Sequence, residues 1–182
     1  MIVWLNGTFG AGKSSTAAEL ADILPGARQF DPEWVGYMLK ANLADQDFTD
    51  FQQLPPWRTL VPVVMAEVAA LTGQHLIAVQ TVLTESYWRE LMAGLGALSL
   101  EVFHVLLRAD PAVLEQRIRA DEVEPGACQW RLDHLGEFAA ARHWLEPAAD
   151  LVIDSTNLSV AEVARTVAAA VAPHLSPAVP AP

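Results

Sequence analysis

The sequence predicts an α/β fold in which a parallel sheet is covered by helices on both faces. Short apolar segments with strand character alternate along the chain with segments whose apolar residues recur at helical spacing. Several strand segments are apolar at every position, which is typical of strands buried on both faces of a parallel sheet. Because such sheets bind ligands outside the carboxyl ends of their strands, functional residues are expected directly after each strand.

The first strand and the first helix enclose a motif of glycines and polar residues. Residues 1–5 form a short apolar run, and residues 15–24 carry apolar side chains at helical spacing. The eight residues from Gly7 to Ser14 read G-x-x-x-x-G-K-S. A glycine-rich surface turn is the alternative interpretation, but the strand before the motif and the helix after it favour a phosphate-binding P-loop.

Each residue type in this motif has a physical reason. Gly7 and Gly12 allow backbone angles that a side chain would forbid, so that successive N–H groups can point at one anion. Lys13 places a positive charge on the β- and γ-phosphates, and the Ser14 hydroxyl can ligate Mg²⁺. The helix that begins near Lys13 adds the positive end of its dipole. We therefore predict ATP and Mg²⁺ as cofactors, bound by Gly7, Phe9, Gly10, Ala11, Gly12, Lys13, Ser14 and Ser15, with Ser14 as the metal ligand.

The remaining elements follow from the same periodicities and from the turn residues between them. Strands are expected at residues 27–30, 75–80, 98–107 and 151–154, and helices at residues 32–40, 57–71, 85–95, 110–119, 130–144 and 159–172. Pro62 should lie in the first turn of its helix or kink it. A capping box from Ser159 to Glu162 opens the last helix. Residues 42–56 and 121–129 are expected to be irregular.

Composition restricts the class of protein. The 182 residues are enough for one domain, predicted at residues 1–174, with a flexible Pro/Ala-rich tail at 175–182. No apolar stretch approaches the length that crosses a bilayer, and no basic segment precedes the first strand, so we expect a cytoplasmic protein. The single cysteine, Cys128, excludes an intramolecular disulfide. A formal charge of −11 argues against nucleic acid as a partner.

Asp31 ends the second predicted strand and faces the same edge of the sheet as the P-loop. Its carboxylate could accept a proton from a substrate hydroxyl while the γ-phosphoryl group is transferred. The alternative is structural, because Asp followed by Pro32 is an ordinary helix start. Both roles can hold at once, and Asp31 is predicted as a catalytic and substrate-binding residue.

The third predicted strand ends in Gln80 and Thr81, where P-loop motors carry the Asp associated with Mg²⁺. The missing Asp argues against a motor or transporter ATPase and leaves the small kinases. The guanine-reading Asn-Lys-x-Asp motif of GTPases is also absent, so ATP is the expected nucleotide. Thr81 and Glu85 follow this strand and are predicted to face the substrate.

Three arginines flank the polar segment 121–129. In small P-loop kinases the equivalent segment is a lid that supplies arginines to the transferred phosphoryl group. Arg117 and Arg131 are predicted as catalytic and Arg119 as nucleotide-binding. Arg117 and Arg119 are two residues apart and cannot share a helix face, so at most one of them should reach the phosphates. A solvated helix end is the alternative for the group.

Two residues near the second helix and the irregular acidic segment are candidates for the acceptor pocket. Arg58 could hold a polar or anionic acceptor group, or could be a surface arginine at a helix start. Trp34 is expected in the core or in the pocket wall. The five histidines show no metal-ligand spacing.

The chain resembles the tunicamycin-resistance ATP-binding proteins. The resemblance rests on residues 2–14, on 31–39 with Asp31-Pro32-Glu33, on 51–58 with Trp57-Arg58, and on the spacing of Arg117, Arg119 and Trp130. Wider relatives are the chloramphenicol, gluconate, shikimate and nucleoside-monophosphate kinases. The resemblance implies a P-loop NTPase fold with a five-stranded parallel sheet of order 2-3-1-4-5, a small lid at about residues 119–131, and a nucleoside antibiotic as ligand. It also places adenine near Asp154, Thr156 and Asn157. The family's lid sequence is poorly matched at residues 121–129.

These observations predict an ATP-dependent phosphotransferase that acts on a small hydroxyl-bearing molecule and confers resistance to an antibiotic such as tunicamycin. Two alternatives stay open: a non-catalytic protein that sequesters the drug, and a nucleoside or sugar kinase of metabolism. Some members of the family are described as membrane-associated, but the last predicted helix lacks Lys and large aromatic residues, which disfavours a membrane partner. The sequence sets no oligomeric state, and a homodimer is compatible with it.

Overall fold

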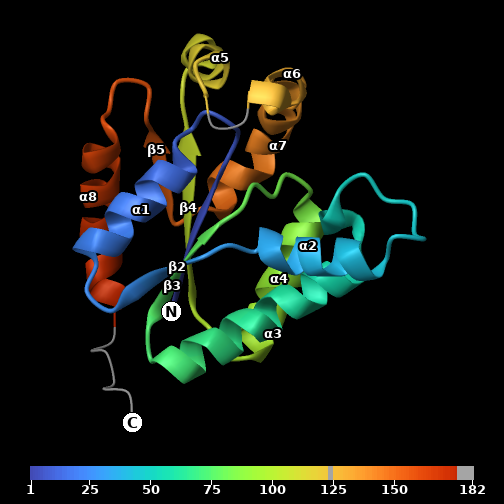
Figure 1. Cartoon of the computed structure of the whole chain (residues 1–182). Coiled ribbons are helices and arrows are strands. Elements are labelled where there is room, and N and C mark those ends of the chain that lie inside the picture. Colours follow the sequence, from blue (N-terminus) through green and yellow to red (C-terminus); the bar gives the residue numbers. More distant parts are fainter. Residues whose placement is uncertain (123–124, 176–182) are drawn as a thin grey trace.

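The computed structural model describes residues 1–122 and 125–175, and its centre is a five-stranded parallel sheet (Figure 1). The strands are β1 (Ile2–Gly7), β2 (Ala27–Phe30), β3 (His75–Val79), β4 (Val102–Arg108) and β5 (Leu151–Asp154). They lie in the order β2-β3-β1-β4-β5, and every neighbouring pair is parallel. The predicted fold class and strand order are confirmed.

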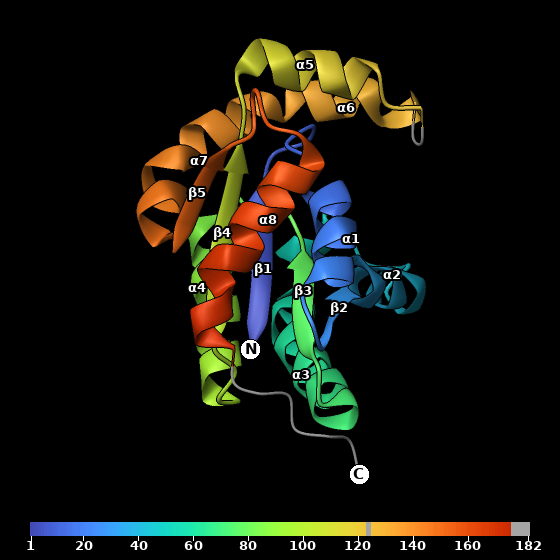
Figure 2. The ribbon, with the colours of Figure 1, turned by 90° about the vertical axis from the view of Figure 1, so that its left-hand side faces the viewer.

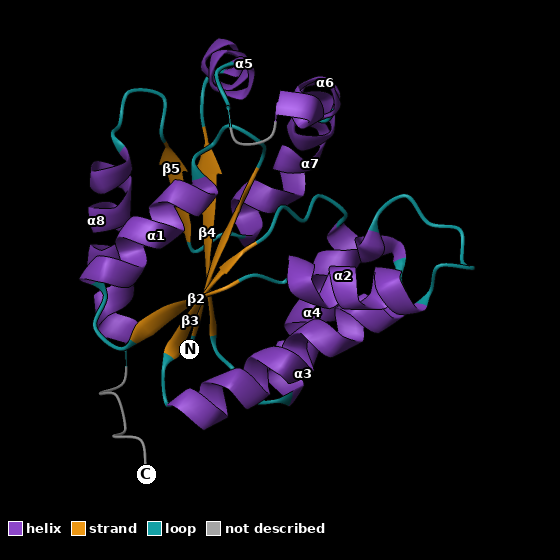
Figure 3. Cartoon of the chain, viewed as in Figure 1, coloured by secondary structure: helices purple, strands orange, loops and turns teal. Residues whose placement is uncertain are grey.

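The helices are α1 (Lys13–Ile23), α2 (Glu33–Asn42), α3 (Pro55–Thr72), α4 (Glu85–Ala97), α5 (Pro111–Arg119), α6 (Cys128–Asp133), α7 (Leu135–Ala148) and α8 (Val160–Val171). Short 3₁₀ turns lie at Phe51–Gln53, Pro125–Ala127 and Ala172–His174. The predicted capping box at the start of α8 is present. Figure 3 shows the residues between α2 and α3 as a loop that extends beyond the helices.

The core has two layers, one on each face of the sheet. Side chains alternate along β1, so that Ile2 and Trp4 pack with α3, α4 and α7, while Val3 and Leu5 pack with α1 and α8. All four side chains are fully buried. Figure 2 looks onto the face that α1 and α8 cover. The carboxyl ends of β1, β3 and β4 are therefore held rigidly next to one another.

Helix α4 and strand β4 differ from the predicted boundaries. The helix ends two residues later than predicted, because it continues through Gly94 and Gly96 to Ala97. Gly94 serves packing, because a Cβ atom there would lie 2.9 Å from Pro62 Cγ of α3. Residues 98–100 then form a turn, in which Leu100 N donates to Leu95 O at 3.0 Å. Strand β4 consequently starts at Val102 rather than at residue 98.

Two further predictions of local structure are wrong in part. Helix α3 starts at Pro55, so Pro62 lies in its interior rather than in the first turn. The predicted helix 130–144 is divided into α6 and α7 at His134, two residues before Gly136, and glycine has a low helix propensity. The predicted irregular segment 121–129 is partly helical from residue 125 onward. Residues 123–124 of the predicted lid and 176–182 of the predicted tail lie outside the described residues.

Candidate nucleotide and acceptor site

The P-loop lies at the carboxyl end of β1 and borders a cleft of about 760 Å³. Gly7 has a φ of +138°, and a Cβ atom there would lie 2.3 Å from Leu107 O of the neighbouring strand. Gly12, directly before α1, has a φ of +91°. Side chains rarely adopt either backbone conformation, so both glycines are required by the path of the loop. The loop and the N-terminus of α1 present backbone N–H groups to the cleft, as an anion site does.

Lys13 is half-buried within this cleft. Its Nζ donates to Thr8 O at 2.9 Å and lies 5.6 Å from the centre of the Phe9 ring. Desolvation of the ammonium lowers the pKa of Lys13 to about 7, although the nearby Glu33 carboxylate opposes the shift, and the Arg131 guanidinium adds to it. Because a phosphate would favour the charged form of Lys13, binding of an anionic ligand should be coupled to protonation of this lysine.

Asn6 ties the P-loop to the segment after β3. The fully buried Asn6 side chain accepts from Gly7 N at 2.8 Å and from Val82 N at 3.0 Å, and it donates to Val82 O at 3.1 Å. Thr81 Oγ1 donates to Gly7 O at 2.8 Å. These bonds fix the entry to the loop from both sides. Sequence reasoning missed Asn6, because its partners are 76 residues away along the chain.

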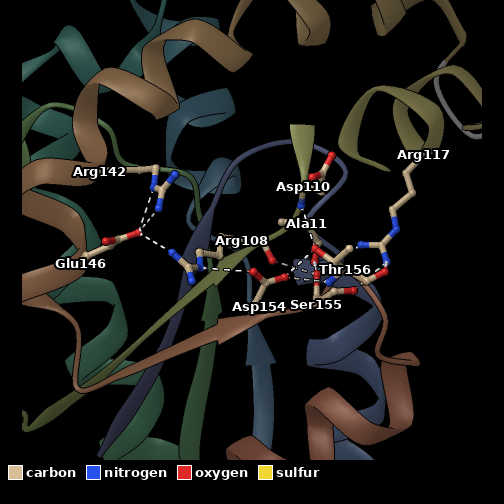
Figure 4. A network of polar contacts seen from close by, with 9 residues as sticks. All are labelled: Ala11, Arg108, Asp110, Arg117, Arg142, Glu146, Asp154, Ser155 and Thr156. Atoms are coloured by element: carbon tan, nitrogen blue, oxygen red, sulfur yellow. Dashed lines mark hydrogen bonds and ion pairs between the residues drawn. The ribbon is translucent and has the colours of Figure 1, made fainter. Parts of the chain in front are cut away.

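Arg117 and Ser155 hold the other side of the P-loop. Arg117 donates to Ser155 O at 2.8 Å and to Gly10 O at 3.4 Å, while Ser155 Oγ donates to Ala11 O at 3.2 Å (Figure 4). Arg117 therefore lines the cleft and connects the loop to the segment after β5. Arg119, in contrast, is exposed and pairs with Glu115 at 2.7 Å, so the structure does not bring it to the cleft.

The residues predicted near adenine lie at a neighbouring hollow. Asp154, Thr156 and Asn157 line a space of about 620 Å³ together with Arg108 and Arg142. Hydrogen bonds from Thr156, followed by the charge of Arg108, lower the pKa of Asp154. The side of the P-loop cleft that faces this segment is instead formed by Ile118, Leu158, Ser159, Val160 and Val163.

A second cavity, of about 420 Å³, adjoins the P-loop cleft. Its wall is rich in aromatic rings, contributed by Phe9, Tyr37, Phe48, Phe51, Tyr87 and Trp130. The cleft and the cavity share Phe9, Glu33, Gln80, Thr81 and Arg131. The two spaces therefore meet at the end of the P-loop, and a ligand in one can touch a ligand in the other.

Glu33, rather than Asp31, is the carboxylate at this junction. Asp31 is exposed and accepts from Glu33 N at 2.9 Å, so its side chain serves the start of α2, and it lines neither space. Glu33 lines both spaces, and its Oε2 accepts from Tyr37 Oη at 3.1 Å. The signal in the sequence for Glu33 was its place three residues after the end of β2, inside the segment that carries the family resemblance.

Arg131 is the lid arginine that lies at the junction. It forms an ion pair with Asp121 and lies 5.8 Å from the centre of the Phe9 ring. Phe9 also contacts Trp130, with 5.0 Å between the ring centres. Through these contacts α6 closes over the P-loop at the carboxyl end of the sheet, beside α5 (Figure 1).

Three predicted substrate residues lie elsewhere. Trp34 is 71% exposed, so the expectation that it lies in the core or the pocket wall is wrong. Glu85 pairs with Arg89 at 2.6 Å, outside the cavity. Arg58 is buried behind the wall, where its Nε donates to Glu90 at 2.6 Å and its guanidinium lies 4.2 Å from the Tyr87 ring centre. Of the five predicted substrate residues, Asp31 included, only Thr81 lines the cavity.

The described ranges contain no group of three or more His, Cys, Asp or Glu residues that could hold a metal ion. A metal at the P-loop would thus rely on Ser14, on phosphates and on water. Across the same part of the chain, no helix is both long and apolar enough to span a bilayer.

Residues 2–128 match the family described as an AAA domain. The tunicamycin resistance protein of Deinococcus radiodurans is 31% identical, over 98% of both chains, with a TM-score of 0.69. A sugar kinase of Janibacter (17% identity, 94% of both chains, TM-score 0.66) and a shikimate kinase of Acinetobacter baumannii (17%, 95% of this chain and 93% of that chain, 0.59) share the fold. The comparison with curated proteins gives no match.

Proposed function

The chain belongs to the tunicamycin-resistance family of P-loop kinase-like proteins, and we propose that it transfers a phosphoryl group from ATP to a hydroxyl group of a small molecule. The observation that carries the proposal is the junction of the P-loop cleft with the aromatic cavity, around Glu33 and Arg131. The cleft suits the nucleotide, and the cavity suits the acceptor. A nucleoside antibiotic such as tunicamycin is the proposed acceptor, because the relative from Deinococcus radiodurans is a tunicamycin resistance protein.

The residues at the junction fit the chemistry of this transfer. The acceptor hydroxyl oxygen bonds to the γ-phosphorus, the bond from that phosphorus to the β,γ-bridging oxygen breaks, and ADP leaves. Glu33 is the proposed acceptor of the hydroxyl proton. The proton acceptor has to lie where the acceptor molecule meets the γ-phosphate, and Glu33 lines both spaces. Lys13 and Arg131 are the cations that balance the charge of the phosphoryl group.

Mg²⁺ would be held by the exposed Ser14 hydroxyl in the first turn of α1, together with phosphate oxygens and water. When bound, the ion neutralises phosphate charge. Oxygen donors of this kind are those that Mg²⁺ prefers, so the residues present fit the ion. We place the reaction in the cytoplasm, which supplies ATP.

The aromatic wall suits a ligand with flat or apolar surfaces. Arg58 is turned toward Gln52 O and Glu90 and supports the wall from behind, so it does not offer its charge to an anionic acceptor. Lys40 and Arg131 are the lysine and arginine in the wall, which also carries Glu33, Asp50 and Glu137. A neutral acceptor fits this balance of charges better than a carboxylate or phosphate ester does.

Acceptor-dependent ADP formation tests the proposal. Purified protein with MgATP should release ADP faster when tunicamycin is added, and much less so with shikimate or gluconate. Saturable tunicamycin binding without ADP formation would instead indicate a sequestering protein. A response to gluconate or shikimate but not to tunicamycin would indicate a kinase of metabolism.

A further inference from the structure

The residue after β3 carries a buried amide oxygen without a partner. Gln80 N donates to Leu5 O at 3.3 Å, and Gln80 O accepts from Trp4 Nε1 at 3.2 Å, so the main chain of Gln80 is fixed. The residue is only 6% exposed, yet it lines both the P-loop cleft and the aromatic cavity. Its Nε2 lies 3.4 Å from Thr81 O, whereas its Oε1 has no hydrogen-bond partner within the described residues.

An unpartnered amide oxygen at this place calls for a hydrogen-bond donor. Buried side-chain oxygens are normally bonded, and a ligand that supplies the missing donor removes the cost of leaving one unsatisfied. Phosphate oxygens at neutral pH carry few protons and cannot supply it. The reacting hydroxyl of the acceptor gives its proton to Glu33 in the proposed reaction. Water bound to the nucleotide's metal ion is a donor that the proposed nucleotide site supplies, and metal binding makes it a strong one.

The position of Gln80 fits such a water. Strand β3 is the direct neighbour of β1 on the side away from β4, with Val79 opposite Leu5, so Gln80 lies beside the start of the P-loop. Ser14, the predicted metal ligand, borders the same cleft from the start of α1. With no carboxylate at the end of β3, the metal environment on this side is an amide oxygen, which orients water without adding negative charge.

We propose that Gln80 is a positioning residue for the nucleotide-bound Mg²⁺, with its Oε1 accepting a hydrogen bond from a water molecule on the metal. The inference rests on the proposed nucleotide site, and it assigns Gln80 a role toward the metal rather than toward the acceptor.

Calorimetry with the non-hydrolysable analogue AMPPNP, with Mg²⁺ and with EDTA, tests the proposal without turnover. For wild-type protein, the ratio of the two dissociation constants gives the gain in affinity from the metal. In Gln80→Leu this gain should fall about tenfold, the scale for losing a residue that supports a metal's ligands, while metal-free affinity stays within about twofold. Gln80→Glu should keep or increase the gain, because a carboxylate accepts the same bond and adds charge.

Gln29→Leu is the matched control, because this exposed amide on β2 lines neither the cleft nor the cavity, and its metal gain should not change. Thermal melting checks that each variant is folded. If Gln80→Leu is unfolded, the metal gain of Gln80→Glu decides whether the proposal holds. An unchanged gain in folded Gln80→Leu, or a tenfold loss in Gln80→Glu, would overturn the inference alone. Failure of the wild-type protein to bind AMPPNP in either condition would overturn the proposed function as well.

Discussion

The low pKa of Lys13 predicts that nucleotide affinity falls as the pH rises above 7. Burial in the cleft lowers this pKa to about 7, so about half of the free protein carries the charge at pH 7 and about 1% at pH 9. Bound phosphates should restore the ordinary, higher pKa, so binding takes up a proton in this range. The dissociation constant for ADP should therefore rise about 50-fold from pH 7 to pH 9.

Calorimetry in buffers of different ionisation enthalpy measures this linkage directly. Proton uptake per ADP bound should increase from about 0.5 at pH 7 to nearly 1 at pH 9. Lys13→Arg is the control, because a guanidinium stays charged throughout and should give affinity that hardly depends on pH. Constant affinity of the wild-type protein between pH 7 and 9, with no proton uptake, would refute the reasoning.

The lowered pKa of Lys13 also makes the free energy of unfolding depend on pH. Since the folded pKa is below the unfolded one, the unfolded chain binds more protons between about pH 7 and 10.5. The contribution of Lys13 to the free energy of unfolding therefore rises with pH across this window, while nucleotide affinity falls. The two opposite trends distinguish a buried lysine from a general effect of pH on the protein.

Three further predictions concern the loop, the base and the nucleotide. Gly7→Ala should lower the free energy of unfolding by about 3 kcal/mol in urea titrations, because its Cβ would collide with Leu107 O. Gly96→Ala is the control and should not destabilise the protein, because there is open space around Gly96. Glu33→Gln should reduce kcat on the order of 10²-fold or more with little change in melting temperature. Asp31→Asn should reduce kcat far less, since Asn also caps the helix. Equal losses of kcat in the two variants would contradict the assignment of Glu33 as the base. ATP should bind more tightly than GTP in a competition titration, since the guanine-reading motif is absent, and equal affinity would contradict this prediction.

The sequence was enough for features that depend on local pattern. The octet at residues 7–14, the apolar strands and the capping box of α8 each have their cause within a few neighbouring residues. The glycine at position 94, in contrast, lies inside α4, where it leaves room for Pro62 of another helix. Periodicity along one segment cannot show such a contact, so the boundary was wrong there.

The candidate site shows the same difference between features with local causes and features that depend on distant residues. The P-loop was visible in the sequence, but the roles of other side chains depend on partners far along the chain. Arg58 is held by Glu90, and Trp34, three residues from the cavity-lining Tyr37, is exposed to solvent. Asp31 and Glu33 are two residues apart, and only the position at which α2 begins decides which carboxylate lines the cavity.

Mass spectrometry of tunicamycin after incubation with the protein and MgATP is the most direct test of the central claim, that the cleft and the cavity form one phosphotransfer site. A product heavier than tunicamycin by one phosphoryl group is expected, together with an equal amount of ADP. It should form with wild-type protein and nearly disappear with Lys13→Ala and with Glu33→Gln. Unmodified tunicamycin after complete incubation, with the drug bound and ATP intact, would contradict the claim.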